Sequence, residues 1–334
     1  MARFLALARA DRQRAVCIAM GEAGEASRVL YRKFGGWATY AAPEEGGVAA
    51  PGQVAGRTLR QLYRAHLLNA RTTVFGVIGH PLVQSKGIHV HNPLLQAAGK
   101  NAVYCRFDVT DLRRFMGDVA PLLGGFSVTI PHKQSILRHL HRLDPGSKVI
   151  GAVNTVVCSG GRFSGTNTDG VGALDAVEGV VTVKGKRILL LGAGGAARAI
   201  AYEASRRGAV VVVANRTASR ARALAREFGM EHVPMSGMED VAFDILINAT
   251  PVGMVPDVRV SPVTESVLSG KVVFDAVYNP PLTRLLKDAE RAGATIIPGT
   301  EMYLHQAARQ SALYSGKRPS LRVMRRLLSA SFHQ

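Results

Sequence analysis

The sequence feature that most restricts the fold is an apolar run that leads directly into a glycine turn and then into an alanine-rich segment. Leu189–Leu191 are followed by Gly192-Ala193-Gly194-Gly195-Ala196-Ala197, and alanines recur up to Ala201. A buried strand that turns sharply into a helix has this pattern, because glycine lets the backbone bend tightly and approach a ligand closely. Further short apolar runs follow at Val210–Ala214, Asp244–Ala249, Val272–Val277 and Ala294–Ile297. The alternation predicts a parallel sheet with helices on both faces.

An earlier part of the chain alternates in a similar way. Strands are predicted at Val74–Ile78, Val103–Phe107, Gly125–Ile130 and Val153–Val157. The helical intervals between these strands indicate a second α/β unit.

At 334 residues the chain is long enough for two or three domains, since a domain commonly holds about 100–200 residues. We expect two α/β domains: a substrate-binding domain over 71–173, joined by C-terminal helices over 303–334, and a Rossmann-type domain over 174–302. Residues 1–70 differ in composition, being rich in arginine. That stretch contains a strand-like Ala15–Met20 and a helix-like Thr58–Asn69.

Lysine and arginine exceed acidic residues by 42 to 24, which gives a formal net charge of +18. Such a charge invites a nucleic-acid partner, because phosphate neutralisation drives that binding. However, only 6% of the residues are aromatic, and the basic residues are spread along the chain. We therefore expect dispersed surface charge and no nucleic-acid partner.

Cysteine usage and hydropathy indicate a cytoplasmic protein. The three cysteines are far apart and form no C-x-x-C pair, as expected in a reducing compartment, and we interpret them as small buried apolar residues: Cys17, Cys105 and Cys158. No apolar run approaches the roughly 18 residues that span a bilayer, and Asp11 and Arg12 close the short apolar start. His89 and His91 have no third ligand at helical spacing, so no metal is expected.

The glycine turn predicts a dinucleotide site. A helix N-terminus offers free N–H groups and a partial positive charge to a pyrophosphate. The next strand ends at Asn215, 23 positions after Gly192, where an NAD site usually carries an acid. Asn215 is neutral and Arg216 is cationic, so NADP is preferred over NAD; for Arg220 a solvated helix face is the alternative. The expected cofactor contacts are Gly192, Ala193, Gly194, Gly195, Ala196, Asn215, Arg216, Thr217 and Arg220.

Polar residues gather at strand ends in the middle of the chain. A lysine follows a strand in Ser127-Val128-Thr129-Ile130-Pro131-His132-Lys133, and an aspartate lies between glycines in Gly165-Thr166-Asn167-Thr168-Asp169-Gly170. Between them is Gly151-Ala152-Val153-Asn154-Thr155. Taken alone, a lysine after a strand is usually a surface residue.

Taken together and in order, these segments resemble the shikimate dehydrogenase family. The resemblance extends from about Val74 to Pro319 and includes Val77-Ile78-Gly79-His80-Pro81, Ser85, His91-Asn92, the three segments above, the glycine turn, Asn248–Met254, Val277-Tyr278-Asn279-Pro280, Gly299, Met302 and Gln306. It implies reversible, NADPH-dependent reduction of 3-dehydroshikimate to shikimate, a step toward the aromatic amino acids.

The resemblance also implies roles for individual residues. Lys133 would give a proton to the oxyanion that develops as hydride reaches C3, and Asp169 would hold that lysine and accept a hydrogen bond from a ring hydroxyl. The implied substrate contacts are Ser85, Thr129, Asn154, Tyr278 and Gln306, and Gly299 joins the cofactor contacts. Amides and hydroxyls suit a polyol because they both donate and accept hydrogen bonds.

One departure from the family concerns substrate specificity. Its usual carboxylate clamp is Ser-x-Ser-Pro, whereas this chain has Ser85-Lys86-Gly87-Ile88. Losing one hydroxyl donor would weaken carboxylate binding by about 1–2 kcal/mol. Alternatively, the lost side chain opens room for the extra hydroxyl of quinate, which makes quinate or mixed quinate/shikimate oxidation the alternative. A non-catalytic NADP-binding regulator is a further alternative, and the retained Lys133 and Asp169 argue against it.

The first seventy residues are instead similar to the closing part of a type I 3-dehydroquinate dehydratase, a (β/α)8 barrel. The similar segments are Met20–Arg28, Phe34–Ala41 and Ala49–Gln53. The similarity matches Arg28 and Gln53 to substrate-binding positions and puts Ala49 where a serine is usual.

So short a piece cannot close a barrel, and Lys33 does not match the Schiff-base lysine of that family, so no dehydratase activity is expected. Two explanations stand: a shortened chain that lacks a dehydratase portion, which we favour because Arg28 and Gln53 would have no partners, or a folded appendage. If the segment is a remnant, we expect it to be poorly ordered or only loosely packed. Monomer and homodimer stay open.

Overall fold

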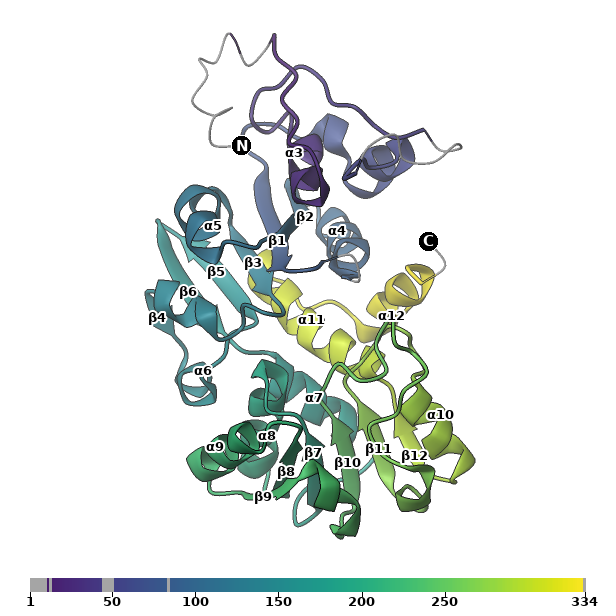
Figure 1. Ribbon diagram of the computed structural model, residues 1–334. Helices are drawn as coiled ribbons and strands as arrows, with labels where there is room; N and C mark the ends of the chain where they lie inside the picture. The colour runs from purple at the N-terminus through teal and green to yellow at the C-terminus, as the bar shows by residue number, and fades with distance from the viewer. Residues whose placement is uncertain (1–10, 12–13, 44–50, 83–84, 333–334) are drawn as a thin grey trace. The chain divides into compact units, whose positions relative to one another are not determined.

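The computed structural model describes residues 11, 14–43, 51–82 and 85–332. The chain forms two compact units (Figure 1). The first comprises Met1–Asp144, Val153–Thr166 and Gln310–Gln334, and the second comprises Pro145–Ala152 and Asn167–Arg309. The described residues before 71 therefore share a unit with the first sheet, whereas the sequence predicted a separate dehydroquinase-like segment.

The first unit is built on a six-stranded mixed sheet with the strand order β2-β1-β3-β5-β6-β4. Its strands are β1 (Thr73–Gly79), β2 (Ala102–Asp108), β3 (Gly125–Val128), β4 (Arg142–Leu143), β5 (Thr155–Ser159) and β6 (Arg162–Thr166). β1 runs parallel to β2 and β3, whereas β5 pairs antiparallel with β3 and β6. Its helices are α3 (Glu25–Val29), α4 (Gly87–Ala97), α5 (Leu112–Asp118) and α12 (Leu321–Ala330).

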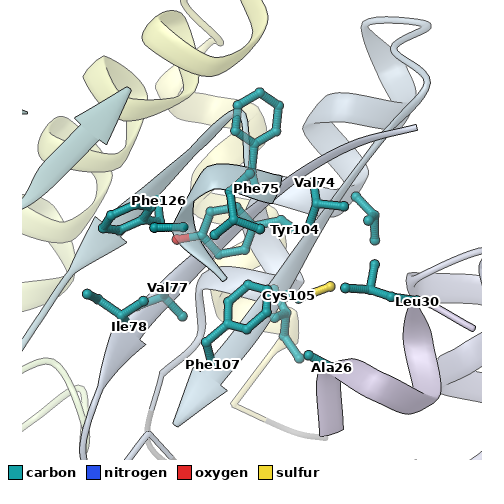
Figure 2. Close-up of a cluster of buried hydrophobic side chains, with 14 of the residues drawn as sticks. Ala26, Leu30, Val74, Phe75, Val77, Ile78, Tyr104, Cys105, Phe107 and Phe126 are labelled. Atoms are coloured by element: carbon teal, nitrogen blue, oxygen red, sulfur yellow. The ribbon is translucent and has the colours of Figure 1, made fainter. Parts of the chain in front are cut away.

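The described part of the N-terminal segment packs into the core of this first unit. Ala26 and Leu30, in and just after α3, are buried and point toward Cys105 and Phe107 of β2 (Figure 2). Because β2 is the edge strand of the sheet, α3 covers apolar surface that a bare edge would leave to solvent. The expectation of a loosely packed remnant is wrong for the described residues.

Two local expectations for this segment also need correction. Ala15–Met20 forms no strand; the amide of Ala19 donates to Oγ of Ser27 at 3.0 Å, and the carbonyl of Ala15 accepts from the amide of Trp37 at 3.2 Å. The helix expected over Thr58–Asn69 is two short turns, η2 (Thr58–Leu62) and η3 (Ala65–Leu67), broken at Arg64, which has a positive φ of 49°. Of the cysteines, only Cys105 is fully buried; Cys17 and Cys158 are partly exposed.

The second unit is the predicted parallel sheet, with the strand order β12-β11-β10-β7-β8-β9. Its strands are β7 (Arg187–Leu191), β8 (Val210–Asn215), β9 (Glu231–Pro234), β10 (Ile245–Asn248), β11 (Val272–Asp275) and β12 (Thr295–Ile297). Its helices are α6 (Pro145–Ile150), α7 (Asp169–Glu178), α8 (Gly195–Arg206), α9 (Ala218–Phe228) and α10 (Arg284–Arg291), and α11 (Gly299–Ser315) continues into the first unit.

Alternate residues of the parallel strands enter two separate hydrophobic clusters. Ile188 and Leu190 pack with α7, α8 and α9, whereas Leu189 and Leu191 pack with α10. Both faces of the sheet are therefore covered by helices, which explains why the inner strands β7, β8, β10 and β11 are mostly apolar rather than alternating.

Two absences among the described residues concern membranes and metals. No helix among them has both the length and the apolar character that crossing a bilayer requires. Within the same residues, no group of three or more His, Cys, Asp or Glu side chains is placed to hold a metal ion.

Candidate active site

The predicted site residues are divided between the two units. Ser85, Thr129, Lys133 and Asn154 belong to the first unit, and Asp169, Tyr278, Gln306 and all the expected cofactor contacts belong to the second.

A tight turn after β3 places Lys133 in the first unit. The amide of Thr129 donates to the carbonyl of Ile78 at 2.9 Å, and the amide of His132 donates to the carbonyl of Thr129 at 2.9 Å. The carbonyl of Lys133 in turn accepts from the amide of Val153 at 2.8 Å. The backbone of the lysine is thus fixed on both sides of the turn, while its side chain is half-buried.

Asn154 is buried, and its neighbours fix the orientation of its side-chain amide. The hydroxyl of Thr155 donates to Oδ1 of Asn154 at 2.8 Å, and Nε2 of Gln310 donates to that hydroxyl at 3.0 Å. Gln310 Nε2 also lies 3.2 Å from the Asn154 carbonyl. With Oδ1 engaged as an acceptor, the Nδ2 end of Asn154 presents N–H donors, as a hydroxylated ligand requires.

Sequence reasoning missed the buried polar cluster that supports Asn154. Ser127 donates to Oε1 of Gln310 at 3.0 Å, accepts from the Tyr104 hydroxyl at 2.7 Å and lies 3.1 Å from the Tyr314 hydroxyl. Sequence spacing could have indicated this cluster: Ser127 lies on β3 two residues before Thr129, which follows the strand, and Gln310 lies four residues after Gln306 along α11.

Gly87 is close-packed rather than open. A Cβ added there would lie 3.1 Å from Tyr104 Cε1 and 3.5 Å from the Tyr104 hydroxyl. The ring of Tyr104 therefore fills the space that a serine at this position would enter.

In the second unit, Asp169 begins α7 and is buried. Its amide donates to Oδ1 of Asn167 at 2.9 Å, and Nδ2 of Asn167 donates to the carbonyl of Ala152 at 2.9 Å. Thr168 donates to Oε1 of Gln306 at 3.5 Å. The loop that carries the aspartate is thus linked to the predicted substrate contact on α11.

The predicted glycine turn joins β7 to α8. Gly192 follows β7 with a φ of 116°, and a Cβ there would lie 3.0 Å from the carbonyl oxygen of Ala249. Gly194 caps α8 in an extended conformation, and a Cβ on it would meet nothing within 4 Å. In the strand order, β7 lies between β10 and β8, at the switch point where such folds bind ligands.

The residues expected to contact the ribose of the cofactor lie at and just after the end of β8. Nδ2 of Asn215 donates to the carbonyl of Thr217 at 3.0 Å, which orders the turn into α9. Arg216 and Arg220 are exposed, and in the described part of the chain neither forms an ion pair. Two guanidinium groups are therefore available to an anion beside this turn.

A buried aspartate holds the loop that carries Tyr278. Oδ1 of Asp275 accepts from Asn248 at 2.9 Å and from the amide of Val277 at 3.0 Å, and Oδ2 accepts from Thr283 at 2.6 Å. Burial raises the pKa of Asp275 to about 6 even though these hydrogen bonds oppose the shift. A Cβ at Gly299 would overlap the Val277 carbonyl at 2.4 Å, so only glycine lets α11 start against this loop.

Most of this chain is similar in sequence to known dehydrogenases. A shikimate dehydrogenase (NADP(+)) of Methanocaldococcus jannaschii is 42% identical to this chain over 275 residues, which cover 78% of this chain and 97% of that protein. The chain belongs to the shikimate dehydrogenase family. The profile of the shikimate dehydrogenase substrate binding domain matches residues 77–156, and the shikimate / quinate 5-dehydrogenase profile matches residues 175–267.

A solved member of the shikimate dehydrogenase family has the same fold. The crystal structure of shikimate 5-dehydrogenase from Thermus thermophilus, in complex with NADP(H) and shikimate, superposes with a TM-score of 0.72 at 35% identity. The match covers 78% of this chain and 100% of that one.

The segment before the dehydrogenase match has its own relatives. The type I 3-dehydroquinase profile matches residues 1–69. The chloroplastic bifunctional 3-dehydroquinate dehydratase/shikimate dehydrogenase of Arabidopsis thaliana is 37% identical over 320 residues, which cover 90% of this chain. The chain spans 53% of the length of that relative.

The dehydratase-like residues are accommodated within the first unit. Arg28 is buried, and its Nε donates to the carbonyl of Gly52 at 2.9 Å. Gln53 is half-buried and also has a partner, so the expectation that both lack partners is wrong. Ala49 lies outside the described residues.

Proposed function

We propose that this chain is an NADP-dependent shikimate dehydrogenase, which reduces 3-dehydroshikimate to shikimate reversibly. The observation that carries the proposal is the retention of Lys133 and Asp169 within the family's ordered motifs. A bound dinucleotide would supply or accept the hydride; the open Gly194 and the close approach at Gly192 fit that group.

The residues of the chain supply the proton and the orientation. In the reductive direction Lys133 donates a proton to the substrate oxygen as the carbonyl becomes an alkoxide, and solvent then reprotonates the amine. Asp169 holds the ammonium group and accepts a hydrogen bond from a ring hydroxyl. Ser85, Thr129, Asn154, Tyr278 and Gln306 hold the other hydroxyls and the carboxylate.

Preference for NADP follows from charge at the end of β8. Asn215 takes the place of the acid that binds a ribose 2′-hydroxyl, and Arg216 and Arg220 are exposed cations suited to a 2′-phosphate. Ala193, Gly195, Ala196, Thr217 and Gly299 complete the proposed cofactor contacts.

The test is the Lys133→Ala variant in the full chain. We expect kcat with shikimate and NADP to fall by about 10²–10⁴-fold, because a positioned proton donor contributes on that order, while calorimetry still detects shikimate binding. The exposed Lys100→Ala serves as the matched control and should leave kcat unchanged. An unchanged kcat in Lys133→Ala would overturn the proposed role.

Quinate is the second candidate substrate, favoured by Gly87 in place of a serine. Against it, Tyr104 fills the space beside Gly87. Initial rates with shikimate and quinate, each with NADP and NAD, decide between the two. The primary proposal fails if shikimate is not oxidised with either cofactor.

We further propose that the protein is cytoplasmic, that it is a monomer or homodimer, and that this chain has no dehydratase activity. The last point rests on Lys33, which does not match the Schiff-base lysine, and on the packing of α3 against β2 instead of within a barrel. A sensitive assay for dehydration of 3-dehydroquinate checks it.

A further inference from the structure

An ion pair links the N-terminal segment to the substrate-domain sheet. Glu25 begins α3, and its Oε2 lies 3.6 Å from Nη1 of Arg106 in β2. Both side chains are largely withdrawn from solvent, with exposed fractions of 12% for Glu25 and 22% for Arg106. Oε1 of Glu25 accepts a hydrogen bond from the Tyr63 hydroxyl at 2.5 Å. The carboxylate is therefore held in place by its own segment before it meets the arginine.

The other side of the same guanidinium reaches the loop that carries Ser85. Nη2 of Arg106 donates to the carbonyl oxygen of Ser85 at 3.0 Å. Nε of Arg106 is buried and, among the described residues, has no hydrogen-bond partner. Arg106 thus depends on Glu25 for its charge balance while it fixes the backbone of Ser85.

A second cation fixes the next residue of the loop. Nζ of Lys86 donates to the carbonyl of Ser331 at 2.8 Å and lies 5.3 Å from the centroid of the Phe332 ring. Lys86 is therefore tied to the C-terminal end of α12, and Ser85 to β2. Of these two attachments, only the one through Arg106 is connected to the N-terminal segment.

We propose that Glu25 is a positioning residue for the dehydrogenase: through Arg106 it holds Ser85 in the conformation that binds the substrate carboxylate. The inference rests on the proposed function, in which Ser85 is a substrate contact. The dehydratase-like segment then serves the dehydrogenase directly, although it contributes no group that touches the substrate.

The physical argument concerns the population of the loop conformation that binds substrate. A charge-assisted hydrogen bond from a guanidinium is about twice as strong as a neutral one, but only while the guanidinium is kept in place. Without the Glu25 charge, the guanidinium of Arg106 is better stabilised by hydration than by its partly buried position, so it turns toward water. The carbonyl of Ser85 then loses its hydrogen-bond donor. The apparent affinity for substrate is proportional to the fraction of molecules whose loop is in the conformation that binds substrate, so it falls as that fraction falls.

The first experiment compares Glu25→Gln with Glu22→Gln in the full chain. Glutamine keeps the size of the side chain and its acceptor for Tyr63 but removes the charge, and Glu22 is an exposed acid three residues earlier. We expect Glu25→Gln to raise KM for shikimate about 3–10-fold, with kcat and KM for NADP unchanged, and Glu22→Gln to change none of these. A purely structural ion pair would lower the melting temperature and leave KM for shikimate as in the wild type.

The second measurement needs no turnover. Hydrogen–deuterium exchange at the amides of residues 85–89, which comprise the end of the loop and the first turn of α4, should be faster in Glu25→Gln than in the wild type or in Glu22→Gln, all measured in the unliganded full chain. Arg106→Lys, which keeps the charge but loses the two-sided fork, should give the same change and serves if Glu25→Gln does not fold.

The outcomes separate the two claims. Unchanged exchange at residues 85–89 together with an unchanged KM overturns the positioning role. A wild-type chain that does not oxidise shikimate, but whose loop still exchanges faster in Glu25→Gln, overturns the proposed function and leaves the coupling of Glu25 to the loop supported.

Discussion

At the residue scale, two buried titratable groups respond to acid in opposite directions. His91 is buried against Tyr104, with ring centroids 4.4 Å apart, and burial lowers its pKa to about 4 although a hydrogen bond with Gln310 opposes the shift. Asp275 is buried with its pKa raised to about 6. Between pH 4 and 6 the folded state therefore resists protonation at His91 and favours protonation at Asp275. Lowering the pH through this range decreases the stability of the folded state through His91 and increases it through Asp275.

The histidine gives a measurable pH dependence. Below pH 6.5 the unfolded chain binds a proton at His91 that the folded chain excludes until about pH 4, so stability from this group is lost as pH falls through that window. Lowering the pH from 7 to 5 should cost the wild type about 2 kcal/mol more than His91→Gln. Urea unfolding at both pH values, followed by circular dichroism, checks this, and parallel losses in the two proteins would contradict it.

At the element scale, prediction from sequence succeeded where burial dictates residue type. The apolar strands β1, β7, β8 and β10 and the glycine turn all appear near their expected positions, because strands covered on both faces leave few alternatives. It missed β6 and β9: Arg162–Thr166 includes a glycine, and Glu231–Pro234 is a polar edge strand that ends in proline. Such strands are specified by their neighbours rather than by their own composition.

The glycine turn gives a prediction about cofactor binding. Gly192→Ala combines a φ of 116°, unfavourable for any L-residue, with a Cβ 3.0 Å from the Ala249 carbonyl oxygen. We expect KM for NADP to rise about tenfold or more. A backbone displacement that weakens the binding free energy by about 1.4 kcal/mol is enough for a tenfold loss of affinity. Gly117→Ala is the control, because a Cβ there meets nothing within 4 Å. Equal KM values for NADP in the two variants would show that the turn tolerates the change.

At the scale of the whole molecule, the sequence could not show where the N-terminal segment packs. The candidate site residues could be named from ordered motifs, because chemistry restricts residues such as Lys133 and Asp169. Resemblance relates residues 1–70 to part of a barrel, whereas the described residues of that segment pack against β2 and its surroundings. Supporting contacts such as Glu25 to Arg106 and Ser127 to Gln310 join segments distant in sequence, and no local pattern reveals them.

Stability measurements test whether this packing is part of the fold. Leu30 is 1% exposed within the cluster shared with Cys105, so Leu30→Ala should lower the free energy of unfolding by about 2–4 kcal/mol. Leu67→Ala, in the same segment but 59% exposed, should cost less than about 0.5 kcal/mol. Similar values for the two variants in denaturant titrations would mean that the segment lies outside the cooperative core.

The packing of α3 against β2 has a consequence for how this protein is divided in the laboratory. A boundary at residue 70, where the dehydratase resemblance ends, would pass through one hydrophobic cluster rather than between two domains. A dehydrogenase expressed from residue 71 would expose Cys105 and Phe107 of its edge strand to water. Exposed apolar edge strands promote edge-to-edge association between molecules. The useful cut sites in this chain are set by its contacts, not by the ancestry of its segments.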